Sequence, residues 1–283
     1  MRWLWNLIKE MWHELGDDGV GDLAAASAFF TLLMLPAGVL AFVASLGSLS
    51  SIVGQDVVDD ARDEVLAWIE RTFGSDAGPI ADTARELFDQ SNAGIATLSF
   101  LVALYALSRG FGGLIRALDG AYDIEEQRRW WWIRIHAVNL GVGTVSLAGF
   151  GSYLRYGLWP RLPDVWLLQQ AVRPLLLALF VSWALMLLRY GPNHRVPLRY
   201  DLPGAIVTSV IWFGLFVGFA LYVRIATVSN GALGIVGAAL AVFTLAYLVN
   251  YGLLIGAELN EILARRAGVV QERPRNRWRQ QVS

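Results

Sequence analysis

The sequence predicts an all-α, polytopic membrane protein with six transmembrane helices, on three observations. The run from Gly231 to Ala257 holds 27 residues and no charge, whereas about 20 apolar residues suffice for a helix to cross the hydrocarbon core of a bilayer. Three further runs are uncharged, at 23–55, 135–154 and 203–223. Hydrophobic residues make up 55% of the chain and charged residues 17%, against about 25% charged residues in soluble domains.

Composition and motifs exclude several classes of function. The chain has no cysteine, which excludes disulfides, thiolate zinc sites, iron–sulfur clusters and cysteine nucleophiles. Its net charge of −1 provides no global basic field to attract nucleic acid. The histidines His13, His136 and His194 lie in different segments, and no HExxH, GxSxG or phosphate-binding Gly–Lys–Ser/Thr motif is present. We therefore expect no cofactor, no metal site and no catalytic residue.

Residues 1–22 are predicted to form an amphipathic helix that lies on the cytoplasmic face of the membrane. Trp5, Ile8, Trp12 and Leu15 share one face of this segment. A tryptophan-rich apolar face of this kind is typical of helices that lie in the membrane interface. The segment lacks the small-residue cleavage site of a secretory signal.

The transmembrane domain is predicted to cover residues 23–263. Its six spans are expected at about 24–46, 95–115, 135–156, 171–188, 203–223 and 232–257. The span at 171–188 is the weakest, because only 15 residues separate Arg173 from Arg189, although both arginines can snorkel to the interfaces.

The loop at 47–94 is long and acidic. Its apolar residues follow helical spacing at 57–69 and again at 79–89, with Gly74 and Gly78 between the two stretches. We expect a helical hairpin that caps the outer face of the bundle. A solvated cap without any ligand role is the alternative.

The distribution of basic residues predicts the topology. With six spans, both termini and two loops share one side of the membrane, and that side holds fifteen Arg and Lys residues against seven on the other. This bias places both termini in the cytoplasm. The tail at 264–283 is basic, and no nucleic-acid partner is needed to explain it. Its arginines are candidates for binding anionic lipids of the inner leaflet: Arg265, Arg266, Arg273, Arg275, Arg277 and Arg279.

The last predicted span carries a polar stripe, which falls within about a 120° arc of the helix. The stripe consists of Thr244, Tyr247, Asn250, Tyr251, Glu258 and Glu261. The opposite arc, which includes Phe243, Leu248 and Leu253, is expected to face lipid. Polar groups in spans are expensive and are often functional, while the alternative is interhelical hydrogen bonding that only holds the bundle together.

Arg109 is the charge that lies well inside a predicted span. Tyr105 and Arg116 lie on the same helix face. An Arg109–Glu258 contact would relieve the cost of burying both charges, so the polar stripe and these residues together predict a polar seam between the spans at 95–115 and 232–257. The functional interpretation of Arg109 is a site that attracts anions or a gate, and the alternative is an arginine that snorkels to lipid phosphates.

Small residues recur at spacings that let helices approach closely. Gly214 and Gly218 are four apart, as are Gly252 and Gly256, and Gly110 and Gly113 lie in the second span. We expect these positions to be helix contacts.

Four segments together resemble one family. They read AAASAFFTLLMLPAG after Asp22, LYALSRGFGGLIRALDGAYDIEEQRRWWWIR, LPGAIVTSVIWFGLFVGFALYV and YLVNYGLLIGAELNEIL. Their order and spacing are similar to those of the YihY/virulence factor BrkB family over roughly Asp22 to Leu263. The chain departs from the family pattern at Phe29 and Phe30, where tyrosine is expected nearby, and at Asp119, where asparagine is expected.

The resemblance implies a six-span protein of the bacterial inner membrane whose biochemical activity is unsettled. Transport and envelope-related roles are the usual proposals, and the family's frequent label "ribonuclease BN" is regarded as mistaken. The positions that match the family pattern are Pro36, Arg109, Pro203, Gly204, Gly256, Glu258 and Asn260.

Three functions stay open from the sequence. The favoured one is transport or lipid handling through the polar seam, with membrane lipids as partners and an unknown substrate. The second is a membrane scaffold or assembly partner without transport. The third, and least favoured, is a membrane-associated ribonuclease.

Overall fold

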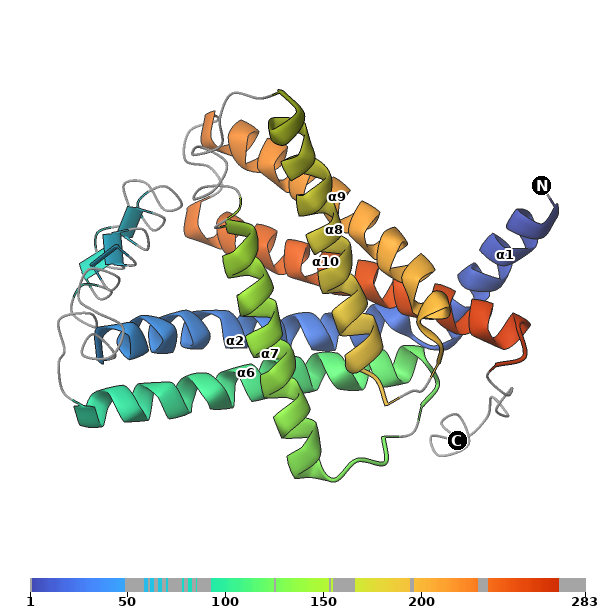
Figure 1. The fold of residues 1–283 in the computed structure, drawn as a ribbon, viewed down its shortest axis with the longest axis horizontal. Coiled ribbons are helices and arrows are strands. Elements are labelled where there is room, and N and C mark those ends of the chain that lie inside the picture. Colours follow the sequence, from blue (N-terminus) through green and yellow to red (C-terminus); the bar gives the residue numbers. More distant parts are fainter. Residues whose placement is uncertain are drawn as a thin grey trace. The chain divides into compact units, whose positions relative to one another are not determined.

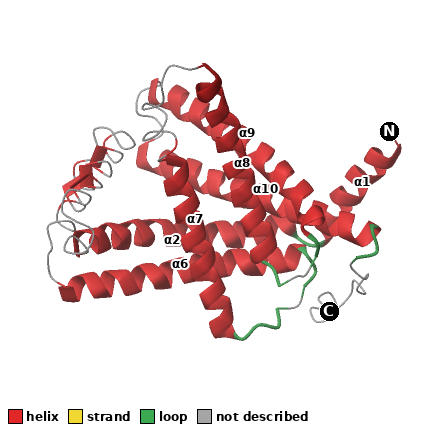
Figure 2. Ribbon diagram, viewed as in Figure 1, coloured by secondary structure: helices red, strands yellow, loops and turns green. Residues whose placement is uncertain are grey.

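The computed structural model describes residues 2–48, 93–124, 126–152, 166–193, 196–228 and 234–269, with single positions between 59 and 85 and residue 154. Within these residues the chain forms seven helices and no strand (Figure 1, Figure 2). The helices are α1 (Arg2–Asp17), α2 (Val20–Ser48), α6 (Ala93–Ala121), α7 (Trp130–Ser152), α8 (Trp166–Tyr190), α9 (Leu198–Val228) and α10 (Gly234–Arg266). The all-α prediction is confirmed.

Two segments of the described helices are long and apolar enough to cross a membrane. They are Leu198–Tyr222 of α9 and Leu240–Arg266 of α10. Shorter apolar helical stretches occur at Val20–Met34 and Pro174–Tyr190. Each of the six predicted spans largely coincides with a described helix, but the six-span topology itself stays a prediction.

The helices run past the ends of the predicted spans. The prediction ends the last span at residue 257, whereas α10 continues to Arg266. Span limits follow from the thickness of the hydrocarbon core, while the hydrogen bonds of a helix continue wherever the chain allows them. The extension keeps Glu258, Asn260 and Glu261 on regular helix, where they project sideways against neighbouring elements.

The chain divides into two compact units, residues 1–31 with 111–283 and residues 32–110. In the first unit, α10 packs along α9, α9 along α8, and α8 along α7. The beginning of α2 packs against the end of α6, because a Cβ at Gly113 would lie 2.9 Å from the Cβ of Phe30. In the second unit, Met34 of α2 fills the space beside Gly110 of α6. The predicted contacts at Gly110 and Gly113 are confirmed.

The backbones of α9 and α10 touch at two glycines. A Cβ at Gly204 would overlap the carbonyl oxygen of Gly256, and a Cβ at Gly256 would overlap the hydroxyl of Thr208. Gly252 packs in the same way against Ile211, 2.7 Å from a Cβ built at the glycine. The predicted contacts at Gly252 and Gly256 are therefore confirmed, since only residues without side chains permit this approach.

Gly214 and Gly218 behave differently from the other glycines of the bundle. Both are exposed, and a Cβ at either would meet no atom of the described residues within 4 Å. The four-residue spacing of glycines is the same at Gly214 and Gly218 as at Gly252 and Gly256. It therefore could not predict which of the two pairs contacts another described helix.

Aromatic side chains join α7, α8 and α9. Trp212 of α9 is 1% exposed, and its ring centroid lies 4.6 Å from that of Trp183 of α8. The Trp183 indole N–H donates to the hydroxyl oxygen of Thr144 of α7 at 3.2 Å. This satisfies the one polar group of the half-buried Trp183 side chain.

The predicted outer cap at 47–94 lies mostly outside the described residues. Within the described part, Arg85 forms ion pairs with Asp82 at 2.8 Å and with Glu70 at 3.6 Å. Asp82 and Arg85 lie in the second of the two stretches that the sequence assigns to a helical hairpin, and Glu70 directly follows the first, but the hairpin and its capping position stay predictions. The tail arginines Arg273, Arg275, Arg277 and Arg279 also lie outside the described residues.

The contact between α9 and α10 can be tested with a matched pair of substitutions on α9. We expect Gly204→Ala to destabilise the protein by about 1–3 kcal/mol, the usual cost of overpacking, because the added methyl group collides with the Gly256 carbonyl and the Asn260 side chain. Gly214→Ala, which meets open space, should leave stability unchanged or raise it by up to about 1 kcal/mol through helix propensity. Apparent melting temperatures in detergent measure both, and equal effects of the two variants would contradict the contact.

Candidate functional site

The C-terminal half of α10 carries four buried polar side chains, which we call the α10 polar cluster: Asn250, Glu258, Asn260 and Glu261. The rest of the predicted stripe lies nearer the surface, with Tyr247 and Tyr251 half-buried and Thr244 exposed. The prediction that the opposite arc faces lipid is wrong at Leu253, which is 1% exposed. At this level neighbouring elements enclose α10 on both sides, so the polar and apolar arcs are buried alike.

The side-chain amide of Asn260 joins three elements. Its Oδ1 accepts a hydrogen bond from the backbone N–H of Gly204 at 2.7 Å. Its Nδ2 donates to the carbonyl oxygen of Asp201 at 3.0 Å and to the hydroxyl oxygen of Tyr122 at 3.2 Å. Asn260 thereby ties α10 to the first turns of α9 and to the residue that follows α6. Burial raises the pKa of the Tyr122 phenol, so this hydroxyl stays neutral.

A second amide fixes the middle of α10. The hydroxyl of Ser27 in α2 donates to Oδ1 of Asn250 at 2.6 Å, and Nδ2 of Asn250 donates to the carbonyl oxygen of Ala246 at 2.8 Å. The indole N–H of Trp212 in α9 donates to the carbonyl oxygen of Val249 at 2.7 Å. These neutral bonds fit the packing role that the sequence analysis kept as the alternative for the stripe.

Glu258 differs from these amides because its bonding is incomplete. The side chain is 1% exposed, and its Oε1 has no hydrogen-bond partner among the described residues. Four other carboxyl groups lie within electrostatic range: Asp18, Glu261, Glu14 and Asp123. Burial of an acceptor without a donor costs free energy. A residue with a purely structural role would not require this cost. Among the described residues, Glu258 is thus the strongest candidate for a functional group.

Ion pairs connect the C-terminal end of α10 to α1. The guanidinium of Arg265 contacts Glu14 at 2.8 Å, Glu10 at 3.0 Å and Glu261 at 3.0 Å. Arg266 pairs with Glu10 as well. Burial alone raises the pKa of Glu10, but the hydrogen bonds from Arg266 and Arg265 outweigh it and leave that pKa lowered. Two of the arginines predicted to bind lipid are therefore engaged by carboxylates of the protein itself.

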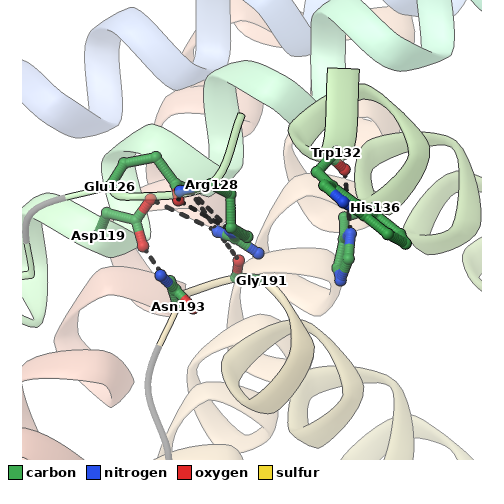
Figure 3. A network of polar contacts seen from close by, with 7 residues as sticks. All are labelled: Asp119, Glu126, Arg128, Trp132, His136, Gly191 and Asn193. Atoms are coloured by element: carbon green, nitrogen blue, oxygen red, sulfur yellow. Dashed lines mark hydrogen bonds and ion pairs between the residues drawn. The ribbon is translucent and has the colours of Figure 1, made fainter. Parts of the chain in front are cut away.

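A separate network links the loop after α6 to the loop after α8 (Figure 3). Oδ1 of Asp119 accepts the backbone N–H of Asn193 at 3.0 Å. The guanidinium of Arg128 donates to Glu126 at 2.9 Å and to the carbonyl oxygen of Gly191 at 3.1 Å, and it lies 3.7 Å from Oδ2 of Asp119. The network joins the segment 119–128 to the loop at 191–193, which is distant in sequence.

Asp119 is the titratable group of this network. Burial raises the pKa of Asp119 to about 7, because the Asn193 N–H and Arg128 only partly compensate and the Glu126 carboxylate opposes ionisation. Burial also acts to raise the pKa of Glu126, but the hydrogen bonds from Arg128 outweigh it and leave that pKa lowered. An asparagine, which the family resemblance leads us to expect here, could accept the same Asn193 bond without the charge.

The remaining residues of the predicted seam lie on α6. Tyr105 and Arg109 belong to the second unit and are exposed. Arg116 belongs to the first unit, is exposed, and places its guanidinium 5.5 Å from the centroid of the Phe30 ring. The predicted contact of Arg109 with Glu258 would join the two units and stays a prediction.

Sequence reasoning missed most partners of the cluster. Asp201 is 1% exposed and pairs with Arg189 at 2.7 Å, a contact that the sequence analysis did not predict. Tyr122 and Ser27 carried no signal beyond being polar residues beside apolar runs. The family pattern was the better guide, because Gly204, Gly256 and Asn260 meet at the junction of α9 and α10.

In the part of the chain that the structure describes, no group of three or more His, Asp and Glu residues is arranged to hold a metal ion. The fold is that of a helical membrane protein with a buried polar junction near the end of an apolar helix. The family model for virulence factor BrkB matches residues 11–281. The chain belongs to this family of membrane proteins.

Individual relatives are distant. A "putative ribonuclease-like protein YfkH" of Bacillus subtilis (strain 168) is 25% identical, over 95% of this chain and 99% of its own length. A "UPF0761 membrane protein" of Xanthomonas oryzae pv. oryzae (strain PXO99A) is 25% identical, and one of Stenotrophomonas maltophilia (strain K279a) is 26% identical, each over 90% of this chain. The chain spans 60% of the length of these two relatives. No solved structure matches significantly.

The raised pKa of Asp119 predicts a pH-dependent stability. Between the ordinary pKa of 3.8 and about 7, the folded protein holds a proton on Asp119 that the unfolded chain has released. The free energy of unfolding therefore falls as pH rises through this window. We expect Asp119→Asn to raise the apparent melting temperature at pH 8, by about 2–4 °C for each kcal/mol gained, and to change it little at pH 4.

The control is Asp82→Asn, an aspartate whose side chain is 76% exposed. It should have no effect at either pH. Destabilisation of the protein by Asp119→Asn at pH 8 would show instead that the charged carboxylate is required there.

Proposed function

We propose that this protein is a six-span protein of the bacterial inner membrane, with both termini in the cytoplasm and a helical cap on the outer face. In this proposal it transports or handles a lipid or another component of the cell envelope. The substrate reaches a polar seam between α6 and α10, and Glu258 is the group that interacts with it.

The buried carboxyl of Glu258 carries the proposal. It lies on a helix segment apolar enough to cross a membrane, and its Oε1 lacks a hydrogen-bond donor. Ionisable groups within such segments are expensive and usually mark a pathway for an ion or a substrate. The side chains of Asn250 and Asn260 make hydrogen bonds to other elements, whereas Oε1 of Glu258 has no such partner among the described residues.

The topology rests on the charge bias of the loops, fifteen basic residues against seven. Membership of a membrane protein family and the two apolar helices agree with it. Arg109 and Tyr105 complete the seam on α6 in this proposal, and an exposed arginine there would attract an anionic headgroup or solute.

Ribonuclease activity is not part of the proposal. The word occurs in the name of one relative that is 25% identical, and the sequence contains no nuclease motif.

The test compares wild type with Glu258→Gln, Arg109→Ala and the exposed control Glu70→Gln by native mass spectrometry after delipidation. Wild type and Glu70→Gln should retain a specific lipid or anion that both seam variants lose, since each variant changes a side chain to which the proposal assigns binding. Melting temperatures close to that of wild type would show that the variants are folded. Equal, non-selective lipid binding by all four proteins would reject a binding seam and favour a membrane scaffold without transport.

A further inference from the structure

One face of α1 is apolar, aromatic and uncovered. Trp5, Ile8 and Trp12 are 69%, 58% and 78% exposed. At 100° for each residue, the three side chains lie within about 60° of one another around the helix. Exposure of two tryptophans and an isoleucine to water on one short helix is unfavourable, and a patch of this kind marks an interaction surface.

The opposite face of α1 is fixed to the protein. Leu7 packs with Leu259 and Ile262 of α10 in a buried cluster, with Met11 beside them. Glu14, which is 4% exposed, binds Arg265 from the same side. The rotation of α1 about its own axis is therefore set by apolar contacts and ion pairs together, so the aromatic face is presented in a fixed orientation.

The charges of α1 are divided between its faces. Both acidic residues of its middle turns, Glu10 and Glu14, are held by Arg265 and Arg266 of α10. The basic side chains Lys9 and His13 are exposed, and helical spacing places them along one edge of the aromatic face. The outward side of α1 is thus aromatic with a basic margin, which complements an anionic lipid surface.

The position of α1 fits the same partner. Leu259 and Ile262 lie in the last two turns of the apolar segment Leu240–Arg266. The end of a membrane-crossing helix lies at the level of the headgroups, where tryptophan is most favourable. A helix fixed to those two turns therefore lies at the level of the headgroups.

We propose that the face of α1 formed by Trp5, Ile8 and Trp12 docks into the headgroup region of a leaflet that contains anionic phospholipid, while Arg265 and Arg266 hold α1 in place. The sequence analysis assigned anionic lipid to these two arginines. The structure engages them with the carboxylates of Glu10, Glu14 and Glu261, which leaves the aromatic face of α1 to make the lipid contact of this region, as the sequence predicts.

The absence of cysteine makes a direct measurement of depth possible. Full-length Ile8→Cys and His13→Cys proteins, each carrying a nitroxide label, are reconstituted in nanodiscs of phosphatidylcholine, with or without phosphatidylglycerol. Power-saturation electron paramagnetic resonance then compares the collision of each label with oxygen, which concentrates in lipid, and with a water-soluble nickel chelate.

We expect the label at position 8 to favour oxygen several-fold over the label at position 13, and more strongly when phosphatidylglycerol is present. Arg265→Gln in the Ile8→Cys background should raise the mobility of the label, because one anchor of α1 is lost. Preferential access of nickel to position 8 in both lipids would overturn the proposal. So would exclusion of both reagents, which would mean that protein covers the face. Neither result depends on whether Glu258 binds a substrate.

Discussion

The hydrogen bonds of the Asn260 side chain are the interaction on which the described part of the bundle depends. A single amide satisfies a backbone N–H of α9, a backbone carbonyl of α9 and the hydroxyl of Tyr122 after α6. Within a membrane-embedded bundle the hydrophobic effect does not drive one helix against another, so close packing and buried polar bonds must do so. Gly204 and Gly256 permit the close approach of the α9 and α10 backbones. The Asn260 side chain then forms hydrogen bonds across the contact.

This junction also determines what is left unsatisfied. The side chains of Asn250 and Asn260 bond to other elements, and Oε1 of Glu258 stays without a donor among the described residues. The nearby basic side chain of Arg265 is shared among three carboxylates. The end of α10 is therefore rich in carboxyl groups, and a positively charged group or a hydrogen-bond donor suits it better than an anion. If the seam handles an anion, the binding charge must come from α6.

The sequence predicted the helices and the glycine contacts because both depend on local patterns. Uncharged runs set where a helix can cross a bilayer, and small residues near Asn260 allowed close packing. The sequence could not predict that Glu14 would bind Arg265, since 251 positions separate them and charge bias alone suggested lipid as the partner. It placed Leu253 in lipid for a similar reason, because helical spacing describes one helix without its neighbours. Gly214 and Gly218 show the converse, since the same spacing as at Gly252 and Gly256 occurs there without a described contact.

The most direct test of the central role of Asn260 is hydrogen exchange of wild type and Asn260→Leu in nanodiscs. Leucine has the same number and branching of side-chain heavy atoms as asparagine and removes all three side-chain bonds. If the amide holds the junction, exchange at Gly204 and the adjoining first turns of α9 should accelerate strongly, while exchange in α7 stays as in wild type. Unchanged exchange at Gly204 in a folded Asn260→Leu protein would contradict the account, because backbone packing alone would then hold α9 and α10 together.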